Sequence, residues 1–507
     1  MKTAARTVFL MAVLTLISKL FGFVREMIIA NFYGASYITD AYVMAITIPT
    51  IIFSGIWGSV AVAYMPVFSD IIEKEGNDRA NVFTNSIISI LLFVSILSSI
   101  AGLIFSEQIV DIFAKGFEGE TAELTIFYVK VTLSYVAFTS IAAVLESNLQ
   151  YKGIFLPQII IGYFQNLVII AAIIISVYTS TYFLIFGWLL AYILRFLFLA
   201  VLANRKGHHY SVAFNLDSRS KTVISLALPI FIGSSMSQIG IFVDKTLASG
   251  LPEGSVSALN YANLLIGLIT GLTVTILTTV IYPKLAQANS LEDHNRFSDI
   301  LSTGINLIII ITVPFSLGAI LYSKPIVQLI YERGAFDAAA TGLTASAFLF
   351  YAIGLLFTSL NTLMTQGFFS MRVMKAPVVF SMVGVIIDIV LNLVLVRPMA
   401  HNGLALATSI AAISNTILFF LVFKYKYPSI RLIRSGRKVF YIIISAIISV
   451  SVSLPFFKWV NVLLDNNYIE KAFVFMFTVI LASTIYLGLL LLFKIEEIKL
   501  IKQIFKK

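Results

Sequence analysis

The feature that most constrains this chain is a series of fourteen apolar runs, each long enough to cross a lipid bilayer as a helix. A helix needs about 20 residues to cross the hydrocarbon core. Clusters of Gly, Pro and charged residues separate the runs. The predicted spans are 7–30, 40–68, 81–106, 122–149, 156–178, 181–203, 221–248, 257–285, 298–321, 340–368, 376–397, 402–423, 438–457 and 471–493.

Composition agrees with a membrane protein of the helical kind. Of the 507 residues, 59% are hydrophobic and 12% are charged, whereas a soluble domain has about 25% charged residues. A membrane β-barrel would show segments of alternating polarity, whereas runs such as Ile159–Val177 are largely apolar. We therefore predict an all-α polytopic membrane protein with fourteen transmembrane helices.

The basic residues predict the orientation of the chain. The net charge is +10, which in a soluble protein would suggest nucleic acid. Most of the Lys and Arg residues, however, fall in segments on one side of the predicted spans, as the positive-inside rule requires of the cytoplasmic side. We expect both termini in the cytoplasm of a bacterium, a location in its inner membrane, and no nucleic-acid partner.

An internal repeat divides the chain. Aligned with itself at an offset of about 217–220 residues, it matches Phe23-Val24-Arg25-Glu26 with Phe242-Val243-Asp244-Lys245. Each half then holds six spans, which predicts two similarly oriented six-helix bundles with a substrate site between them. The predicted domains are an N-terminal bundle (1–215), a C-terminal bundle (216–428) and two additional helices with a cytoplasmic tail (429–507).

Two cations in the first span are candidates for substrate binding. A charge inside the bilayer costs about 2.5–3.5 kcal/mol on insertion scales, and Lys19 and Arg25 lie within span 7–30. On an ideal helix they are about 120° apart in azimuth. A bend at Gly22 would bring both into one cavity, where they would suit a pyrophosphate. The alternatives are snorkelling of Lys19 to the interface and a local pair between Arg25 and Glu26.

Carboxylates within the spans suggest a gate and a cation site. Asp40 opens the second span and is interpreted either as its N-cap or as a gate. Asp244 and Asp388 offer oxygen ligands for Na⁺ or a proton relay, with Thr408 as a third ligand. Asp244 could instead form an ion pair with Lys245 or with a cation of the first half of the chain. Glu146 and Arg195 are expected to form interhelical pairs or interfacial anchors.

The residues Gly22-Phe23-Val24-Arg25-Glu26, Thr39-Asp40-Ala41-Tyr42, Pro252-Glu253-Gly254-Ser255-Val256-Ser257 and Glu332-Arg333-Gly334-Ala335-Phe336 resemble motifs of the MurJ/MviN lipid II flippases of the MOP superfamily. The resemblance covers nearly the whole chain. It implies a V-shaped pair of bundles around a cationic cavity, with a groove for a polyprenyl tail on the two extra helices. It also implies outward flipping of a lipid-linked disaccharide-pentapeptide by alternating access, driven by Na⁺ or the membrane potential.

The resemblance assigns roles to individual residues. Lys19, Arg25 and Asp40 match residues of the family's cavity, and Asp244, Asp388 and Thr408 resemble its cation site. The chain departs from the family at two places, since no basic residue follows Pro49 closely and Asn263-Leu264 stands where the family has Asp-Arg. Asn263 is kept as a head-group contact, and the lost cations leave the cargo open.

The sequence thus predicts a transporter rather than an enzyme, namely a flippase that moves an undecaprenyl-pyrophosphate-linked peptidoglycan precursor. It would act as a monomer among membrane lipids, without an organic cofactor and with Na⁺ as the expected coupling ion. The alternatives are a flippase for another undecaprenyl-linked oligosaccharide, or a MATE-type cation-coupled drug antiporter. The chain has no cysteine, four histidines and no P-loop, which disfavours thiol chemistry and ATP-driven transport.

Overall fold

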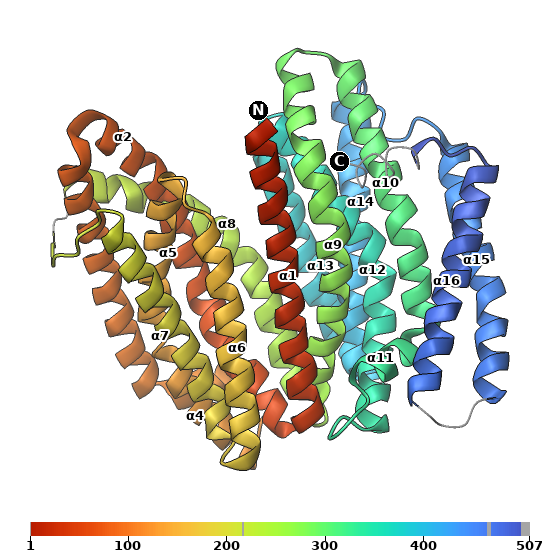
Figure 1. Ribbon diagram of the computed structural model, residues 1–507, viewed down its shortest axis with the longest axis horizontal. Coiled ribbons are helices and arrows are strands. Elements are labelled where there is room, and N and C mark those ends of the chain that lie inside the picture. The colour runs from red at the N-terminus through yellow and green to blue at the C-terminus, as the bar shows by residue number, and fades with distance from the viewer. Residues whose placement is uncertain (1, 215–216, 464–467, 498–507) are drawn as a thin grey trace. The chain divides into compact units, whose positions relative to one another are not determined.

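The computed structural model describes residues 2–214, 217–463 and 468–497, and within these ranges the regular structure is entirely helical (Figure 1). The helices are α1 (Lys2–Tyr33), α2 (Tyr37–Ile104), α3 (Ser106–Phe113), α4 (Gly119–Leu133), α5 (Val136–Tyr151), α6 (Leu156–Tyr178), α7 (Tyr182–Arg205), α8 (Ser218–Ser249), α9 (Ser255–Ser290), α10 (His294–Leu321), α11 (Ser323–Tyr331), α12 (Ala338–Ser370), α13 (Lys375–Met399), α14 (His401–Lys426), α15 (Gly436–Leu463) and α16 (Tyr468–Leu492). The predicted all-α class is confirmed.

Every predicted span falls on a helix. Eleven segments of the described residues are long and apolar enough to cross a membrane. One of them, α2, contains two predicted spans, and its backbone leaves the helical conformation at Gly76, where φ is 83°. Another, Gly119–Tyr151, combines α4 and α5 into a single candidate span. Positive φ favours glycine because glycine has no Cβ to clash, so Gly76 allows α2 to turn back.

Helices α1 to α8 belong to the first of two compact units, Met1–Ser257. Within it α2 packs along α4, α5 and α8, while α1 packs on α6 and α6 on α7. Stacked aromatic rings fill the core where the two arms of α2 meet, since Tyr64 stacks on Phe68 and Phe83. The Tyr64 hydroxyl also bonds to Thr84 and Asn148. This satisfied polar group fixes α5 against both arms of α2.

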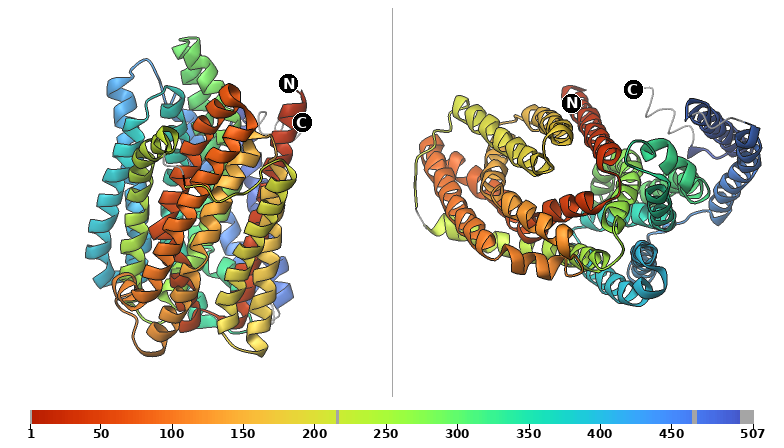
Figure 2. Two further views of the ribbon diagram at one scale, coloured as in Figure 1. Left: turned by 90° about the vertical axis from the view of Figure 1, so that its left-hand side faces the viewer. Right: turned by 90° about the horizontal axis from the view of Figure 1, so that it is seen from below.

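The second unit, Ala258–Lys507, holds most of α9 and all of α10 to α16. There α12 packs on α10 and α14, and α13 packs on α14. The last two long helices, α15 and α16, run side by side at one edge of this unit (Figure 2). The Tyr486 hydroxyl of α16 donates to the Ile310 carbonyl of α10. Asn306 of α10 donates to the buried carboxylate of Glu497, which follows α16.

Two short helices mark corresponding places in the repeat. α3 begins at Ser106 and α11 at Ser323. Each follows a long helix and precedes a candidate membrane span, Gly119–Tyr151 after α3 and Ala338–Ser370 after α11. The predicted domain boundaries after residues 215 and 428 stay predictions. The compact units divide instead after Ser257, which places α8 in unit 1.

Candidate functional site

Helix α1 presents one face to α6, and this face carries Arg25. Residues Leu14, Ser18 and Arg25 recur at helical spacing and so share one side of α1. The Tyr163 hydroxyl of α6 donates to the Leu14 carbonyl at 2.7 Å. A Cβ at Gly162 of α6 would lie 2.9 Å from the Ser18 hydroxyl oxygen. The close approach of the two backbones therefore places the Arg25 side chain against α6.

The guanidinium of Arg25 is held by three kinds of contact. Its Nη2 donates to Oε1 of Glu26 at 2.6 Å and its Nη1 donates to Oδ1 of Asn166 at 3.1 Å. Its Cζ also lies 5.3 Å from the centre of the Trp188 ring, a cation–π geometry. The Arg25 side chain is 18% exposed and that of Glu26 is 6% exposed. The local pair with Glu26, one of the two interpretations from sequence, is therefore present.

A buried hydroxyl without a hydrogen-bond partner lies in the same cluster. The ring of Tyr42 packs edge-on against Trp188, with centroids 6.1 Å apart. Tyr42 is 1% exposed, and its hydroxyl has no hydrogen-bond partner among the described residues. Because buried polar groups are nearly always paired, this hydroxyl marks a place where a further polar group would be stabilised.

Lys19 lies apart from this cluster. Helix α1 is continuous through Gly22, so no bend there turns Lys19 toward Arg25. The Lys19 side chain is exposed and makes no ion pair within the described part of the chain. The structure thus presents one cation already paired with a carboxylate and one accessible cation on a different side of the same helix.

Asp40 caps a helix other than its own. The N-cap of α2 is Ser36, so the interpretation of Asp40 as the cap of the second span is wrong. Instead its Oδ2 accepts from Gly254 N at 2.8 Å, and its Oδ1 accepts from Ser257 N at 2.7 Å. These N–H groups are at the start of α9, where the helix has unsatisfied donors and a partial positive charge. At 2% exposed, Asp40 is buried beneath this helix terminus.

The turn before α9 is fitted closely to the start of α2. Gly254 has φ of 83°, and a Cβ there would lie 2.5 Å from the Ala35 carbonyl oxygen. Glu253 Oε1 accepts from Tyr37 N at 2.8 Å. The two segments thus cap one another reciprocally, each with a carboxylate on the other's backbone.

Asp244 lies in unit 1 near the end of α8. The ammonium of Lys245 interacts electrostatically with Asp244 and with Asp40. The alternative that Asp244 associates with Lys245 is therefore supported by the structure. Lys245 thus interacts with two candidate carboxylates, Asp40 and Asp244.

The remaining ion-site candidates lie in unit 2. Asp388 of α13 is 8% exposed, and its Oδ2 accepts from Asn392 Nδ2 at 3.4 Å. One turn earlier, Gly384 leaves room for the Asn415 amide of α14, which a Cβ at residue 384 would meet. Thr408 of α14 is partly buried, and its hydroxyl donates to the Leu404 carbonyl at 3.1 Å. Asp388 thus lies beside the amide side chain of Asn392, and carboxylate and amide oxygens are ligand types suited to an alkali cation.

Asn263, the last candidate, is exposed on α9 in unit 2. The structure therefore joins Asp40, Lys245 and Asp244 in one part of unit 1, and Arg25 with Glu26 in another. Asp388 and Thr408 lie in unit 2, on the neighbouring helices α13 and α14.

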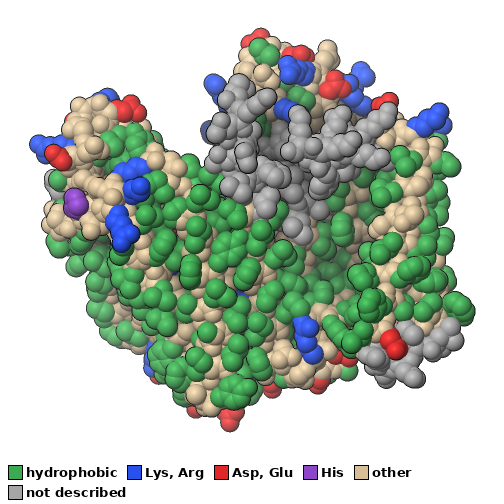
Figure 3. Space-filling view, viewed as in Figure 1, with side chains coloured by type: hydrophobic (Ala, Val, Ile, Leu, Met, Phe, Trp, Pro, Cys, Tyr) green, Lys and Arg blue, Asp and Glu red, His purple; other side chains and the backbone are tan. Residues whose placement is uncertain are grey.

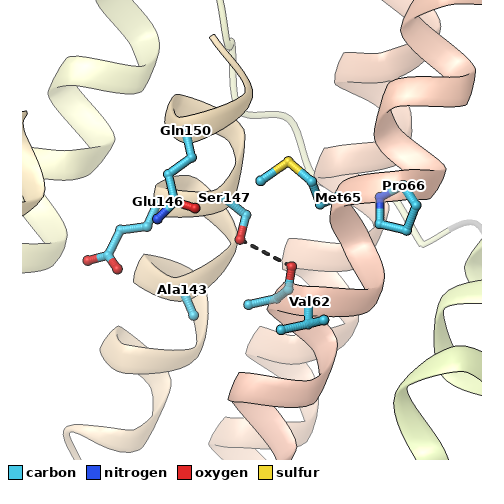
Figure 4. Close-up of a pocket in the computed structure, with 8 residues that line it drawn as sticks. Val62, Met65, Pro66, Ala143, Glu146, Ser147 and Gln150 are labelled. Carbon is cyan, nitrogen blue, oxygen red and sulfur yellow. Dashed lines mark hydrogen bonds between the residues drawn. The ribbon is translucent and has the colours of Figure 1, made fainter. Parts of the chain in front are cut away.

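Sequence reasoning missed two partners of Arg25, namely Asn166 and Trp188, and the packing of Tyr42 against Trp188. Asn166 was detectable as an amide inside the apolar run of α6, whereas the aromatic rings carry no such signal in an aromatic-rich chain. A second ion pair, Arg195 with Glu146, joins α7 to α5, which confirms the predicted interhelical pair. Glu146 and Gln150 also border a pocket of about 570 Å³ between α5 and α2 (Figure 4).

Comparisons with known proteins agree with the resemblance. The family model described as "Lipid II flippase MurJ" matches residues 29–480. A protein of Rickettsia prowazekii (strain Madrid E) named "Probable lipid II flippase MurJ" is 27% identical over 97% of this chain and 98% of its own length. A protein of Burkholderia cenocepacia named "Lipid II flippase MurJ" is 26% identical over 80% of this chain and 81% of its own length.

Solved structures show the same fold. One titled "Lipid II flippase MurJ, inward closed conformation" superposes with a TM-score of 0.83 at 24% identity, covering 97% of this chain and all of that one. An inward-facing multidrug MATE transporter of the MOP superfamily superposes with a TM-score of 0.64 at 15% identity, over 84% of this chain and all of that one.

The family model covers most of the chain, and the candidate spans make it a multi-pass protein of the bacterial inner membrane. The family consists of transporters rather than catalytic enzymes. The chain shares its fold with a MATE transporter of the MOP superfamily. This chain belongs to the MurJ family of lipid II flippases.

Proposed function

We propose that this protein moves lipid II, a lipid-linked peptidoglycan precursor, from the inner to the outer leaflet of the cytoplasmic membrane by alternating access. The observation that carries the proposal is the match of the lipid II flippase family to residues 29–480. The cations within α1 support it, because a cation inside a predicted membrane span is suited to an anionic head group. We take both termini to be cytoplasmic, as the positive-inside pattern predicts, and the protein to act as a monomer.

Arg25 binds the pyrophosphate of the substrate in this proposal, and Glu26 is the group that the pyrophosphate displaces. In the structure Glu26 occupies the Nε and Nη2 donors of Arg25. A diphosphate offers more oxygens than one carboxylate and pairs well with a guanidinium fork. The unpartnered Tyr42 hydroxyl would supply an additional hydrogen bond to the same anion, and the accessible Lys19 would bind it on arrival.

Asp40 is the proposed outer gate. While its carboxylate caps α9, the start of α9 is tied to the start of α2. α9 continues from this cap into unit 2. Loss of the two hydrogen bonds would release the N-terminus of α9, which is the movement that opening toward the outside requires. A capping carboxylate is worth roughly 0.5–2 kcal/mol, small enough to be broken in each cycle.

Na⁺ is the proposed coupling ion, with Asp388 and Thr408 of unit 2 as proposed ligands, and Asp244 of unit 1 stays a ligand predicted from sequence alone. The donor types fit, since carboxylate, hydroxyl and amide oxygens are the ligands of hard cations. In α13 the Asn392 amide nitrogen donates to the Asp388 carboxylate, so a carboxylate and an amide side chain lie together there. Binding there would neutralise a buried carboxylate, and this change in charge would favour one conformation over the other.

Two other cargoes remain as alternatives. Another undecaprenyl-linked oligosaccharide shares the pyrophosphate and would use Arg25 in the same way, and Leu264 in place of the family's arginine favours a head group of lower charge. A MATE-type drug antiporter has support only in the fold shared with MATE structures. It would need acidic cavity residues for a cationic drug, whereas Lys19 and Arg25 are basic.

Rescue of a flippase-depleted bacterium tests the proposal. Wild-type protein should restore growth, and Arg25→Ala should fail while reaching the membrane at a normal level. Arg333→Ala is a matched control, because Arg333 lies in a loop of unit 2 and donates to a neighbouring backbone carbonyl. Failure of the wild-type protein to rescue in a closely related host, or rescue by Arg25→Ala, would contradict the proposal.

A further inference from the structure

Residues 206–214, which we call the strap, follow α7 toward α8, have no regular secondary structure beyond the turn at 206–207, and lie along α2. Three polar residues of α2, spaced four apart, hold the strap. Asn81 Nδ2 donates to the Gly207 carbonyl at 3.1 Å, and Asn85 Nδ2 donates to the His209 carbonyl at 3.0 Å. The amide of Ala213 donates to the hydroxyl of Ser89 at 3.2 Å. The strap is therefore fixed to one face of α2.

Its apolar side chains are largely exposed. The bonds to α2 use backbone groups of residues 207, 209 and 213 and the hydroxyl of residue 211, and the Tyr210 hydroxyl lies 3.5 Å from that of Ser89. The intervening residues Tyr210, Val212 and Phe214 are 50%, 72% and 65% exposed. Three large apolar side chains on one edge of a loop are costly in water, at about 25 cal/mol per Å² of apolar surface.

One aromatic contact places the end of the strap beside the exposed apolar surface of α2. The Phe214 ring packs edge-on against Phe93 of α2, with centroids 6.3 Å apart. Phe93 is 60% exposed and begins a series of exposed apolar residues that continues through Leu97 and Ile104. In a spanning helix such a series faces lipid, so Phe214 lies beside the end of a lipid-facing surface.

Basic side chains flank the strap. Arg205 precedes it, Lys206 is its first residue and Lys221 follows it, and all three are exposed. The acidic Glu75 nearby is already paired with Arg219. Figure 3 shows Lys and Arg side chains gathered at one end of unit 1, next to a broad apolar surface. Near the inner leaflet each such cation is attracted to anionic lipid by about 1 kcal/mol.

We propose that the strap is an interfacial anchor that binds anionic lipids of the cytoplasmic leaflet. Tyr210, Val212 and Phe214 enter the region between head groups and acyl chains, and Arg205, Lys206 and Lys221 bind the lipid phosphates. The inference rests on the proposed topology but not on the cargo. Because the strap leads to α8, lipid bound there would steady the connection between the two repeats.

Fluorescence quenching in vesicles tests the anchor. The chain has no cysteine, so Val212→Cys can be labelled alone with an environment-sensitive fluorophore, and Ala213→Cys serves as the inward-facing control. In phosphatidylcholine vesicles containing phosphatidylglycerol, we expect the label at residue 212 to emit at shorter wavelength than at 213. It should also be quenched more by spin-labelled lipid and less by aqueous iodide.

A second variant tests the charge. Arg205→Glu with Lys206→Glu should reduce the lipid quenching at residue 212, and so should omission of phosphatidylglycerol. Equal quenching by lipid at residues 212 and 213 would overturn the proposal. So would quenching at residue 212 that stays the same both in the double variant and without phosphatidylglycerol. Protection of residue 212 from iodide without quenching by lipid would mean that protein covers the strap, and would overturn it too. The same variants without the label are also tested for rescue of a flippase-depleted bacterium. This assay reports flippase activity, whereas the quenching measurement reports lipid binding by the strap.

Discussion

The carboxylate of Asp40 accepts a 2.7 Å hydrogen bond from the backbone N–H of Ser257, which lies 217 residues later in the chain. A second bond joins the same carboxylate to Gly254 N. Asp40 therefore connects the first turn of α2 to the first turn of α9. A charged acceptor at a helix N-terminus satisfies orphan donors and complements the helix dipole.

Removing this cap should loosen the start of α9. Asp40→Ala should lower the free energy of unfolding by roughly 0.5–2 kcal/mol, whereas Asp40→Asn should retain much of the stability because asparagine also caps well. Single-cysteine labelling reports the local effect, since Ser257 is fully buried and Ser257→Cys should react slowly. Asp40→Ala should speed that labelling, and unchanged labelling would contradict the gate.

Gly254 should tolerate no side chain. Its φ is 83°, and a Cβ would meet the Ala35 carbonyl oxygen at 2.5 Å. Gly254→Ala should therefore lower the melting temperature in detergent and speed labelling at Ser257→Cys. Gly233→Ala in α8 is the control, because nothing lies within 4 Å of a Cβ there, and alanine is the better helix former by about 1 kcal/mol. Equal effects of the two substitutions would show that the fit at Gly254 is unimportant.

Substitutions at Arg25 and at Glu26 should change the affinity for a lipid-linked pyrophosphate in opposite directions. Arg25→Lys keeps the charge but loses the fork, so the affinity for a lipid-linked pyrophosphate should fall roughly tenfold, the equivalent of one charge-assisted hydrogen bond. Glu26→Gln should raise that affinity, because the anion no longer competes with a carboxylate. Binding to purified protein measures both. A lower affinity in Glu26→Gln would show that Glu26 only supports the fold.

Sodium should change the conformation of the protein through Asp388. Replacing K⁺ by Na⁺ at constant ionic strength should alter the labelling rate of Ser257→Cys, and Asp388→Asn should abolish the change. Asp299→Asn is a suitable control, since Asp299 pairs with Arg434 at an exposed site. A sodium response that survives in Asp388→Asn would remove this residue from the coupling site.

The strap should detach in mild acid. Burial, together with the nearby charges of Lys152 and His209, lowers the pKa of the His208 imidazole from its ordinary 6.5 to about 4. Between pH 6.5 and 4 the detached strap binds a proton that the docked strap does not, so docking weakens as the pH falls through this window. Iodide accessibility at Ala213→Cys should rise accordingly. His208→Gln should remove the pH dependence, and its persistence would exclude His208 as the cause.

The long helices could be predicted because each carries its own signal. A run such as α6 is apolar apart from a few polar residues such as Gln165 and Asn166, and in lipid a helix satisfies its backbone internally. The division of α2 into two spans was predicted from a cluster of Gly and charged residues between apolar runs, and the chain turns there at Gly76. The pair of Arg195 with Glu146 followed from the cost of isolated charges in a membrane.

The partners of the site residues could not be predicted in the same way. Asp40 is at the start of a helix, and local sequence favours the cap of that helix over one 217 residues away. The contacts of Arg25 with Asn166 and Trp188 depend on how α1 packs on α6 and α7, which periodicity alone does not specify. Sequence therefore identified which side chains are expensive to bury, and the fold determined what neutralises them.

The central claim is that this protein transfers a lipid-linked pyrophosphate glycan across the bilayer with Arg25 as an essential contact. Purified protein in vesicles with lipid II on one leaflet tests it directly, with another undecaprenyl-linked glycan in parallel. The account predicts that the wild-type protein makes lipid II accessible on the opposite leaflet and that Arg25→Ala does not. Absence of transfer by the wild-type protein, or equal transfer by Arg25→Ala, would contradict it.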